Sequence, residues 1–216
     1  MAASFKRQLP KIKQHLEVKS WSDCYEQDKY MDSCVIENEM IQVEEYDKVF
    51  FDQMIFKNVT FIGSFFQLLE CVDVIFDHCD FSNARLNQAV FHRVEFRQCK
   101  MAGTQLAEAH FQHVLFVDTL APYLECQFTS FKHVMLEKSV LKHANFFEAK
   151  LMKVEFQECQ LDEASFYEVD LAGIDLSASY FERIAVTSGK LKGCIISPEQ
   201  AIGFVKAFGM VVNEKG

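Results

Sequence analysis

The sequence has little of the two residues that interrupt regular structure, since only eight of its 216 residues are glycine and three are proline. Half of the residues are hydrophobic, so the composition excludes a disordered chain or a Pro/Gly-rich linker. The apolar runs are only a few residues long, far short of the roughly 20 residues that cross a bilayer. We therefore expect a soluble, folded protein with a sizeable core and no membrane contact.

The first twenty residues lack the apolar segment of a secretory signal, although five of them are Lys or Arg. Positive charge is scarce in the chain as a whole, with 22 Lys and Arg against 31 Asp and Glu, a net charge of −9 and a pI near 5.3. Such a chain repels nucleic acid and favours a basic protein as its partner. We expect a cytoplasmic protein that does not bind nucleic acid.

The motifs of common catalytic and metal sites are absent from the sequence. There is no CxxC pair, no glycine-rich phosphate loop and no nucleophile elbow. His113 and His133, twenty residues apart, could stack, but two imidazoles without nearby Cys or carboxylate ligands make a poor metal site. The chain is therefore not expected to be an enzyme or to need a metal or cofactor.

The dominant positive feature is a five-residue repeat. Of the 30 sites at every fifth position from Phe51 to Ile196, fifteen are Phe and nine are Leu. The position two residues earlier is small or β-branched, as in Val74, Cys79 and Ala84, and the others are mostly polar. An amphipathic helix needs spacings of three and four, and a straight strand needs two. A chain that turns after every five residues, with one large and one small side chain pointing inward, explains the pattern.

Segments such as "CDFSN", "ARLNQ" and "ANFFE" resemble the motif of pentapeptide-repeat proteins: small, polar, Leu or Phe, polar, variable. This resemblance implies an all-β fold, a right-handed quadrilateral β-helix with about 20 residues per coil and coils about 4.8 Å apart. We expect an N-terminal segment or cap at 1–30, the β-helix at 31–196 and a C-terminal cap at 197–216. The eight cysteines fall on the inward positions, where they act as compact hydrophobes rather than as disulfides or metal ligands.

One stretch, "TLAPYLECQF", departs from the repeat. Ala121 and Cys126 underfill two successive large sites, Pro122 interrupts ladder bonding, and Phe128 is out of register. Because the count of five continues across it, we expect a bend or bulge in the wall. A functional loop is the alternative.

The repeats end at "SPEQAIGFVKAFGMVV". Ser197, Pro198 and Gln200 predict a capped helix that stops at Gly209, and Met210–Val212 is expected to be a short strand. This tail is similar to that of the Qnr- and MfpA-type quinolone-resistance proteins, in which a helix and strand form a tail-to-tail homodimer. A cap on a monomer is the alternative. The candidate dimer residues are Ile202, Val205, Phe208, Met210 and Val212.

The same resemblance implies that an acidic dimer mimics duplex DNA, binds the type II topoisomerases DNA gyrase and topoisomerase IV, and protects them from quinolones. The large loops of some Qnr-type members have no counterpart here. Residues 154–182 contain eight acids and no Lys or Arg, and residues twenty apart, such as Glu155 and Asp175 or Glu148 and Glu168, should stack about 5 Å apart. The alternatives are an ordinary acidic surface, or a scaffold or immunity-type adaptor for another basic protein. The candidate contact residues, here called the acidic belt, are Glu155, Glu158, Glu163, Glu168, Asp170 and Asp175.

Overall fold

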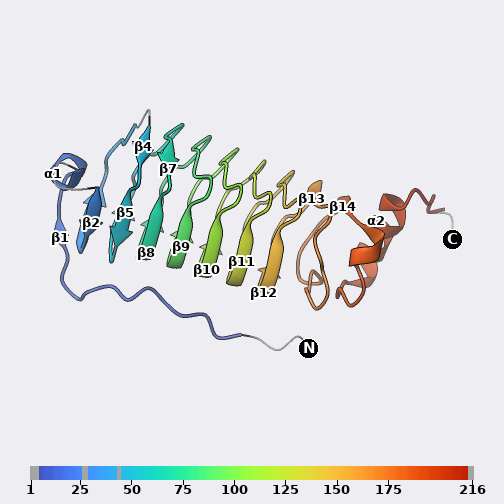
Figure 1. The fold of residues 1–216 in the computed structure, drawn as a ribbon. Coiled ribbons are helices and arrows are strands. Elements are labelled where there is room, and N and C mark those ends of the chain that lie inside the picture. Colours follow the sequence, from blue (N-terminus) through green and yellow to red (C-terminus); the bar gives the residue numbers. More distant parts are fainter. Residues whose placement is uncertain (1–4, 26–28, 43–44, 214–216) are drawn as a thin grey trace.

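The computed structural model describes residues 5–25, 29–42 and 45–213. Figure 1 shows a rod in which the strands of successive coils lie side by side, with a helix at the C-terminal end. The strands pair in parallel and join residues twenty apart, as in Phe91 with Phe111 and Phe111 with Phe131. The predicted quadrilateral β-helix is therefore confirmed.

Two kinds of strand build the coils. Five long strands form a continuous wall, namely β8 (Glu70–Asp77), β9 (Val90–Arg97), β10 (His110–Val117), β11 (Ser130–Glu137) and β12 (Lys150–Gln157). The short ones are β1 (Glu17–Val18), β2 (Tyr30–Asp32), β3 (Cys34–Glu37), β4 (Tyr46–Asp47), β5 (Phe50–Asp52), β6 (Ile55–Lys57), β7 (Phe66–Gln67), β13 (Ala164–Phe166) and β14 (Ile184–Val186).

Each coil has four faces, here called A, B, C and D, and each face is identified by the column of large residues that points inward from it. The long strands form faces A and B, whereas faces C and D consist of turns, single bridges and, on face D near the two ends, the short strand pairs β4–β7 and β13–β14. Residues with positive φ mark the corners, for example Arg93 with φ 55° and Gln98 with φ 50°. Face A is centred on Phe91, Phe111 and Phe131, face B on Phe96, Phe116 and Leu136, face C on Met101, Ala121 and Leu141, and face D on Leu106, Cys126 and Phe146.

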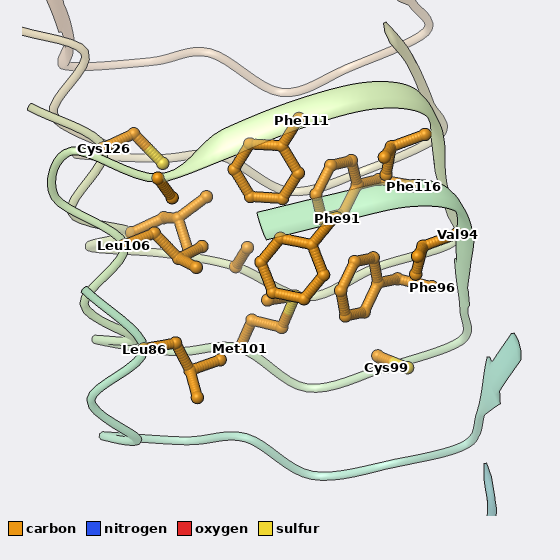
Figure 2. Close-up of a cluster of buried hydrophobic side chains, with 14 of the residues drawn as sticks. Leu86, Phe91, Val94, Phe96, Cys99, Met101, Leu106, Phe111, Phe116 and Cys126 are labelled. Carbon is orange, nitrogen blue, oxygen red and sulfur yellow. The ribbon is translucent and has the colours of Figure 1, made fainter. Parts of the chain in front are cut away.

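The large inward residues form columns of stacked side chains (Figure 2). Phe96 and Phe116 lie 4.8 Å apart at an interplanar angle of 4°, and Phe91 and Phe111 lie 4.8 Å apart at 9°. This separation equals the sheet spacing, because equivalent rings sit on hydrogen-bonded neighbouring strands. Apolar burial along these columns is the main stabilising contribution to the rod.

The small inward position has a second role, which the repeat does not reveal. At several positions where it holds Thr, Ser or Cys, the side chain donates a hydrogen bond to the carbonyl of the large residue 23 positions earlier, whereas Ser139 donates to Glu137 O instead. Thr104 donates to Phe81 O at 2.8 Å, Thr129 to Leu106 O at 2.7 Å, and Cys159 Sγ to Leu136 O at 3.2 Å. Burial raises the pKa of the Cys159 thiol to about 11, so it stays protonated and can donate. The Cys24 side chain lies outside the described residues.

The bend or bulge expected at "TLAPYLECQF" is absent, and that prediction was wrong. Residues 118–137 have the same turn and strand pattern as the coil before them. Leu124, at the small position, is buried beside Ala121 and Cys126, so large and small residues have exchanged places. Pro122 has no N–H to donate, but this position does not need one. Two coils earlier, Ser82 occupies the same position, and its N–H donates to the Asp80 side chain and not to a neighbouring coil. Pro122 therefore removes no ladder hydrogen bond.

The N-terminal end of the rod is covered by the short helix α1 (Trp21–Tyr25), which the sequence reasoning missed. The Trp21 ring packs edge-on against Phe51 at 6.0 Å, and its backbone N–H donates to the Glu39 carboxylate. The first large inward residues of the coils are Met31, Ile36 and Ile41, and all three are buried.

Residues 5–16, here called the strap, run back along the outside of the rod from the edge strand β1 (Figure 1). The strap follows the corner between faces A and B from coil to coil. Lys11 N–H donates to Asp73 Oδ1 at 2.8 Å, Gln8 N–H to His113 Nδ1 at 3.3 Å, and Arg7 to Glu95 Oε1 at 2.6 Å. Asp73, Glu95 and His113 are buried as a result.

The C-terminal end is closed by α2 (Pro198–Ala207), which follows a 3-10 turn, η1 (Ser188–Lys190). The predicted capping box is present, with Ser197 and Gln200 bonded to each other's backbone N–H. Gln200 Nε2 also donates to Leu176 O and Ser179 O, each at 2.7 Å, which ties the helix to the last coils. Phe204 is buried and packs edge-on against Phe181 at 5.5 Å.

The short strand predicted at Met210–Val212 is not formed, and the Met210 N–H donates instead to Val205 O of α2 at 3.2 Å. A strand needs a hydrogen-bonding neighbour, and none of the described strands lies beside this tail. Within the described ranges, no helix is long and apolar enough to cross a membrane.

Candidate partner-binding surface

The acidic belt encircles the last coils instead of occupying a single face. Glu155, Glu158 and Asp175 are on face B. Asp170 is on face A, Glu163 ends a segment of face C, and Glu168 ends a segment of face D. A flat partner surface cannot contact all six side chains at once, whereas a concave partner surface that surrounds the rod can contact all of them.

Most carboxylates of the acidic belt are held by neutral donors. Gln157 Nε2 donates to Glu155 Oε2 at 2.8 Å, the Ser177 N–H to Asp175 Oδ1 at 2.9 Å, and Thr187 Oγ1 to Glu168 Oε1 at 3.1 Å. Glu163 instead forms an ion pair with Arg183, and the Ala172 N–H donates to Asp170 Oδ1 at 3.0 Å. Among the described residues, no ion pair involves the other five, so their charge remains to attract a cationic partner.

Glu155 and Asp175 were predicted to stack, but their segments are not paired as neighbouring strands. The ladder of long strands ends at β12, and Asp175 bridges to Ile195. The hydrogen-bond register also shifts by one residue at the corner after β12. The Glu158 N–H donates to Ala178 O, twenty residues later, whereas one coil earlier the Lys138 N–H donates to Gln157 O, nineteen residues later. Face D keeps its register at this level, because Glu148 N–H donates to Tyr167 O at 3.1 Å.

An open groove of about 700 Å³ lies between face C and α2. Three carboxylates line it, those of Asp162, Glu182 and Glu199, against one cation, Lys142. Burial alone would raise the pKa of Asp162, but the backbone N–H groups of Arg183 and Glu182 outweigh it and hold that pKa below its ordinary value. The sequence reasoning missed these three acids as site candidates because it could not place α2 beside face C.

The C-terminal cap exposes an apolar surface at the outer end of the rod. Phe208 is 41% exposed, Met210 53% and Ile202 46%, whereas Val205 and Val212 are half-buried. Val211, which the sequence reasoning omitted, is 94% exposed. A contiguous exposed apolar surface is typical of a protein interface.

The predicted stacking of His113 on His133 is confirmed, with ring centroids 4.6 Å apart and an angle of 13°. Burial and the neighbouring charge of His133 lower the pKa of His113, so His113 is neutral and its Nδ1 can accept from Gln8. No group of three metal-ligating side chains occurs within residues 5–25, 29–42 and 45–213. Both histidines contact the strap, His113 through the Gln8 N–H and His133 through the Phe5 ring at 5.5 Å, which the sequence pattern did not show.

Comparisons with known proteins agree with this architecture. A model described as "Pentapeptide repeat region" matches residues 69–146, and "Pentapeptide repeats (8 copies)" matches 144–183. No curated protein sequence gives a significant match.

Several solved structures are similar to the chain. A trypsin-treated form of QnrB1, a plasmid-mediated fluoroquinolone resistance protein, is 19% identical with a TM-score of 0.43, covering 92% of this chain and 98% of its own. Full-length QnrB1 is 15% identical with a TM-score of 0.32, covering 82% and 100%. HetL, a heterocyst-differentiation protein from the cyanobacterium Nostoc, is 12% identical with a TM-score of 0.31, covering 79% and 90%. Because the family models together span residues 69–183, more than half of the sequence, this chain belongs to the pentapeptide-repeat family.

Proposed function

We propose that this protein binds the type II topoisomerases DNA gyrase and topoisomerase IV as a mimic of duplex DNA and protects them from quinolones. The main observation in support of this proposal is the acidic belt around the last coils, where five of six carboxylates have no ion-pair partner among the described residues. A basic DNA-binding saddle is complementary to such a ring of charge. The role is binding and not catalysis, as the similarity of the tail sequence to Qnr- and MfpA-type proteins implies.

The cap supports a symmetric dimer for this role. The exposed side chains of Ile202, Phe208 and Met210 lie beyond the acidic belt at the end of the rod. A tail-to-tail dimer covers these side chains, supplies a neighbouring strand for the Met210–Val212 segment and brings two acidic belts together at the centre of a longer rod. Isologous contacts of this kind close on themselves.

Neutralising three acids of the belt should abolish the topoisomerase effect. In supercoiling assays with and without a quinolone, we expect Glu155→Gln/Glu158→Gln/Asp175→Asn to act more than about ten-fold more weakly than wild type, because three contacts at about 0.5–1 kcal/mol each are lost. The matched control is Glu37→Gln/Asp47→Asn/Glu70→Gln, which removes the same charge at the far end of the rod. Equal loss in both variants, or no inhibition or protection by wild type, contradicts the proposal.

A charge in the cap should separate the dimer. We expect wild type to sediment at twice the 25.0 kDa chain mass and Phe208→Glu/Met210→Glu at the single mass, because each carboxylate would be buried without a partner in the interface. Met152→Glu, at an exposed position on face A, is the control and should leave the dimer intact. A wild-type monomer at micromolar concentration rules out this arrangement.

A further inference from the structure

Face D carries a second surface, separate from the cap, in the four coils from residue 104 to 168. Its outward side chains include three aromatic rings in successive coils. Phe128 and Tyr167 are each 51% exposed, and Phe147 between them is half-buried. The Phe147 ring contacts Phe128 edge-on at 5.5 Å and lies parallel to Tyr167 at 6.3 Å.

The charge on this surface is of one sign. Each coil contributes one carboxylate, and segments 104–108, 124–128, 144–148 and 164–168 contain no Lys, Arg or His. Neutral groups hold three of the four, since Gln88 donates to Glu108 at 3.1 Å, Asn145 to Glu125 at 3.1 Å and Thr187 to Glu168 at 3.1 Å. Glu148 is exposed, and none of the four is in an ion pair among the described residues.

Aromatic rings beside carboxylates fit one cationic side chain better than any other. An arginine guanidinium stacks on the face of a ring and at the same time forms hydrogen bonds to a carboxylate, whereas a lysine ammonium is more strongly hydrated and stacks less well. Phosphate groups of a nucleic acid would be repelled by four carboxylates. Two open grooves lie on other walls of the rod, one beside face C and one on face A, so neither overlaps this surface.

We propose that face D binds an arginine-bearing segment of a partner protein, with guanidinium groups on the rings of Phe147 and Tyr167 and beside Glu148 and Glu168. This surface shares Glu168 with the acidic belt, but the segment need not come from a topoisomerase. The repeating rings and carboxylates accept arginines at intervals of about one coil, roughly 4.8 Å. A second copy of this chain is the competing occupant, because face A carries Lys132, Lys150 and Lys153.

The test measures fluorescence anisotropy of two labelled peptides, one alternating Arg and Gly and the other alternating Lys and Gly, at physiological salt. Wild type should bind the arginine peptide about five-fold more tightly than the lysine peptide. In the variant Phe147→Ser/Tyr167→Ser, the affinity for the arginine peptide should fall about five-fold, because cation–π contacts with arginine are lost. The affinity for the lysine peptide should not change. Glu148→Gln/Glu168→Gln should weaken both peptides.

The matched control is Tyr180→Ser, which removes a 65% exposed ring from face C and should change neither affinity. Circular dichroism checks that each variant keeps the fold. Equal binding of the two peptides, or an equal effect of Tyr180→Ser, overturns the proposal. It is also overturned if the face D variants reduce self-association of the chain in sedimentation and do not change peptide binding.

Discussion

Replacing Phe96 with alanine is expected to lower the free energy of unfolding by about 4 kcal/mol, close to the largest effect of any single truncation in this chain. Phe96 is fully buried, and its ring is stacked between Phe76 at 5.1 Å and Phe116 at 4.8 Å. The coils above and below are fixed by the hydrogen-bonded ladder, so the wall cannot collapse into the cavity. Urea unfolding followed by circular dichroism measures the loss.

The chain contains its own control for this prediction. Phe128 has the same side chain but is half exposed on face D, so Phe128→Ala should change the free energy of unfolding by less than about 0.5 kcal/mol. Similar losses at the two positions would contradict the view that inward stacking stabilises the rod.

Replacing Asp73 with asparagine is expected to cost about 3 kcal/mol and to release the strap. The buried carboxylate accepts from Arg93 Nε at 2.5 Å, from Arg93 Nη2 at 2.7 Å and from Lys11 N–H at 2.8 Å. Without it, the Arg93 guanidinium is left without its counter-charge in a largely buried position. Urea unfolding gives the cost, and hydrogen exchange at the Lys11 amide reports strap release.

The control is Asp32→Asn, which removes another strap ion pair. Asp32 lies 4.0 Å from Lys13 Nζ with both side chains about half exposed, so its loss should cost less than about 0.5 kcal/mol. Burial acts to raise the pKa of Asp73, but Arg93 and the Lys11 N–H outweigh it, and the pKa lies below its ordinary value of 3.8. The carboxylate therefore stabilises the fold above about pH 4, and that contribution is lost as the pH falls further. An Asp73→Asn variant that keeps this acid-dependent loss would contradict the assignment.

The repeat is readable from the sequence because most inward positions obey one steric rule, and a single residue out of place is visible against thirty equivalent sites. The helix α2 is readable because Ser197, Pro198 and Gln200 act locally. Phe128 illustrates the limit of this reading. It departs from the five-residue pattern, and the sequence reasoning attributed this to a disturbed wall, whereas the wall is regular and Phe128 faces solvent beside Phe147.

The sequence by itself determined the β-helix, its inward residues and the concentration of acids in the last coils, because neighbours in a solenoid are always about twenty residues apart. Only the tertiary structure decided where the strap lies, since Lys11 and Asp73 are 62 residues apart and follow no repeat. It also decided how the acidic belt is distributed over the faces, because a shift in hydrogen bonding after β12 changes which carboxylates are neighbours. Repeating local rules build the rod, but single long-range contacts determine which surfaces it presents.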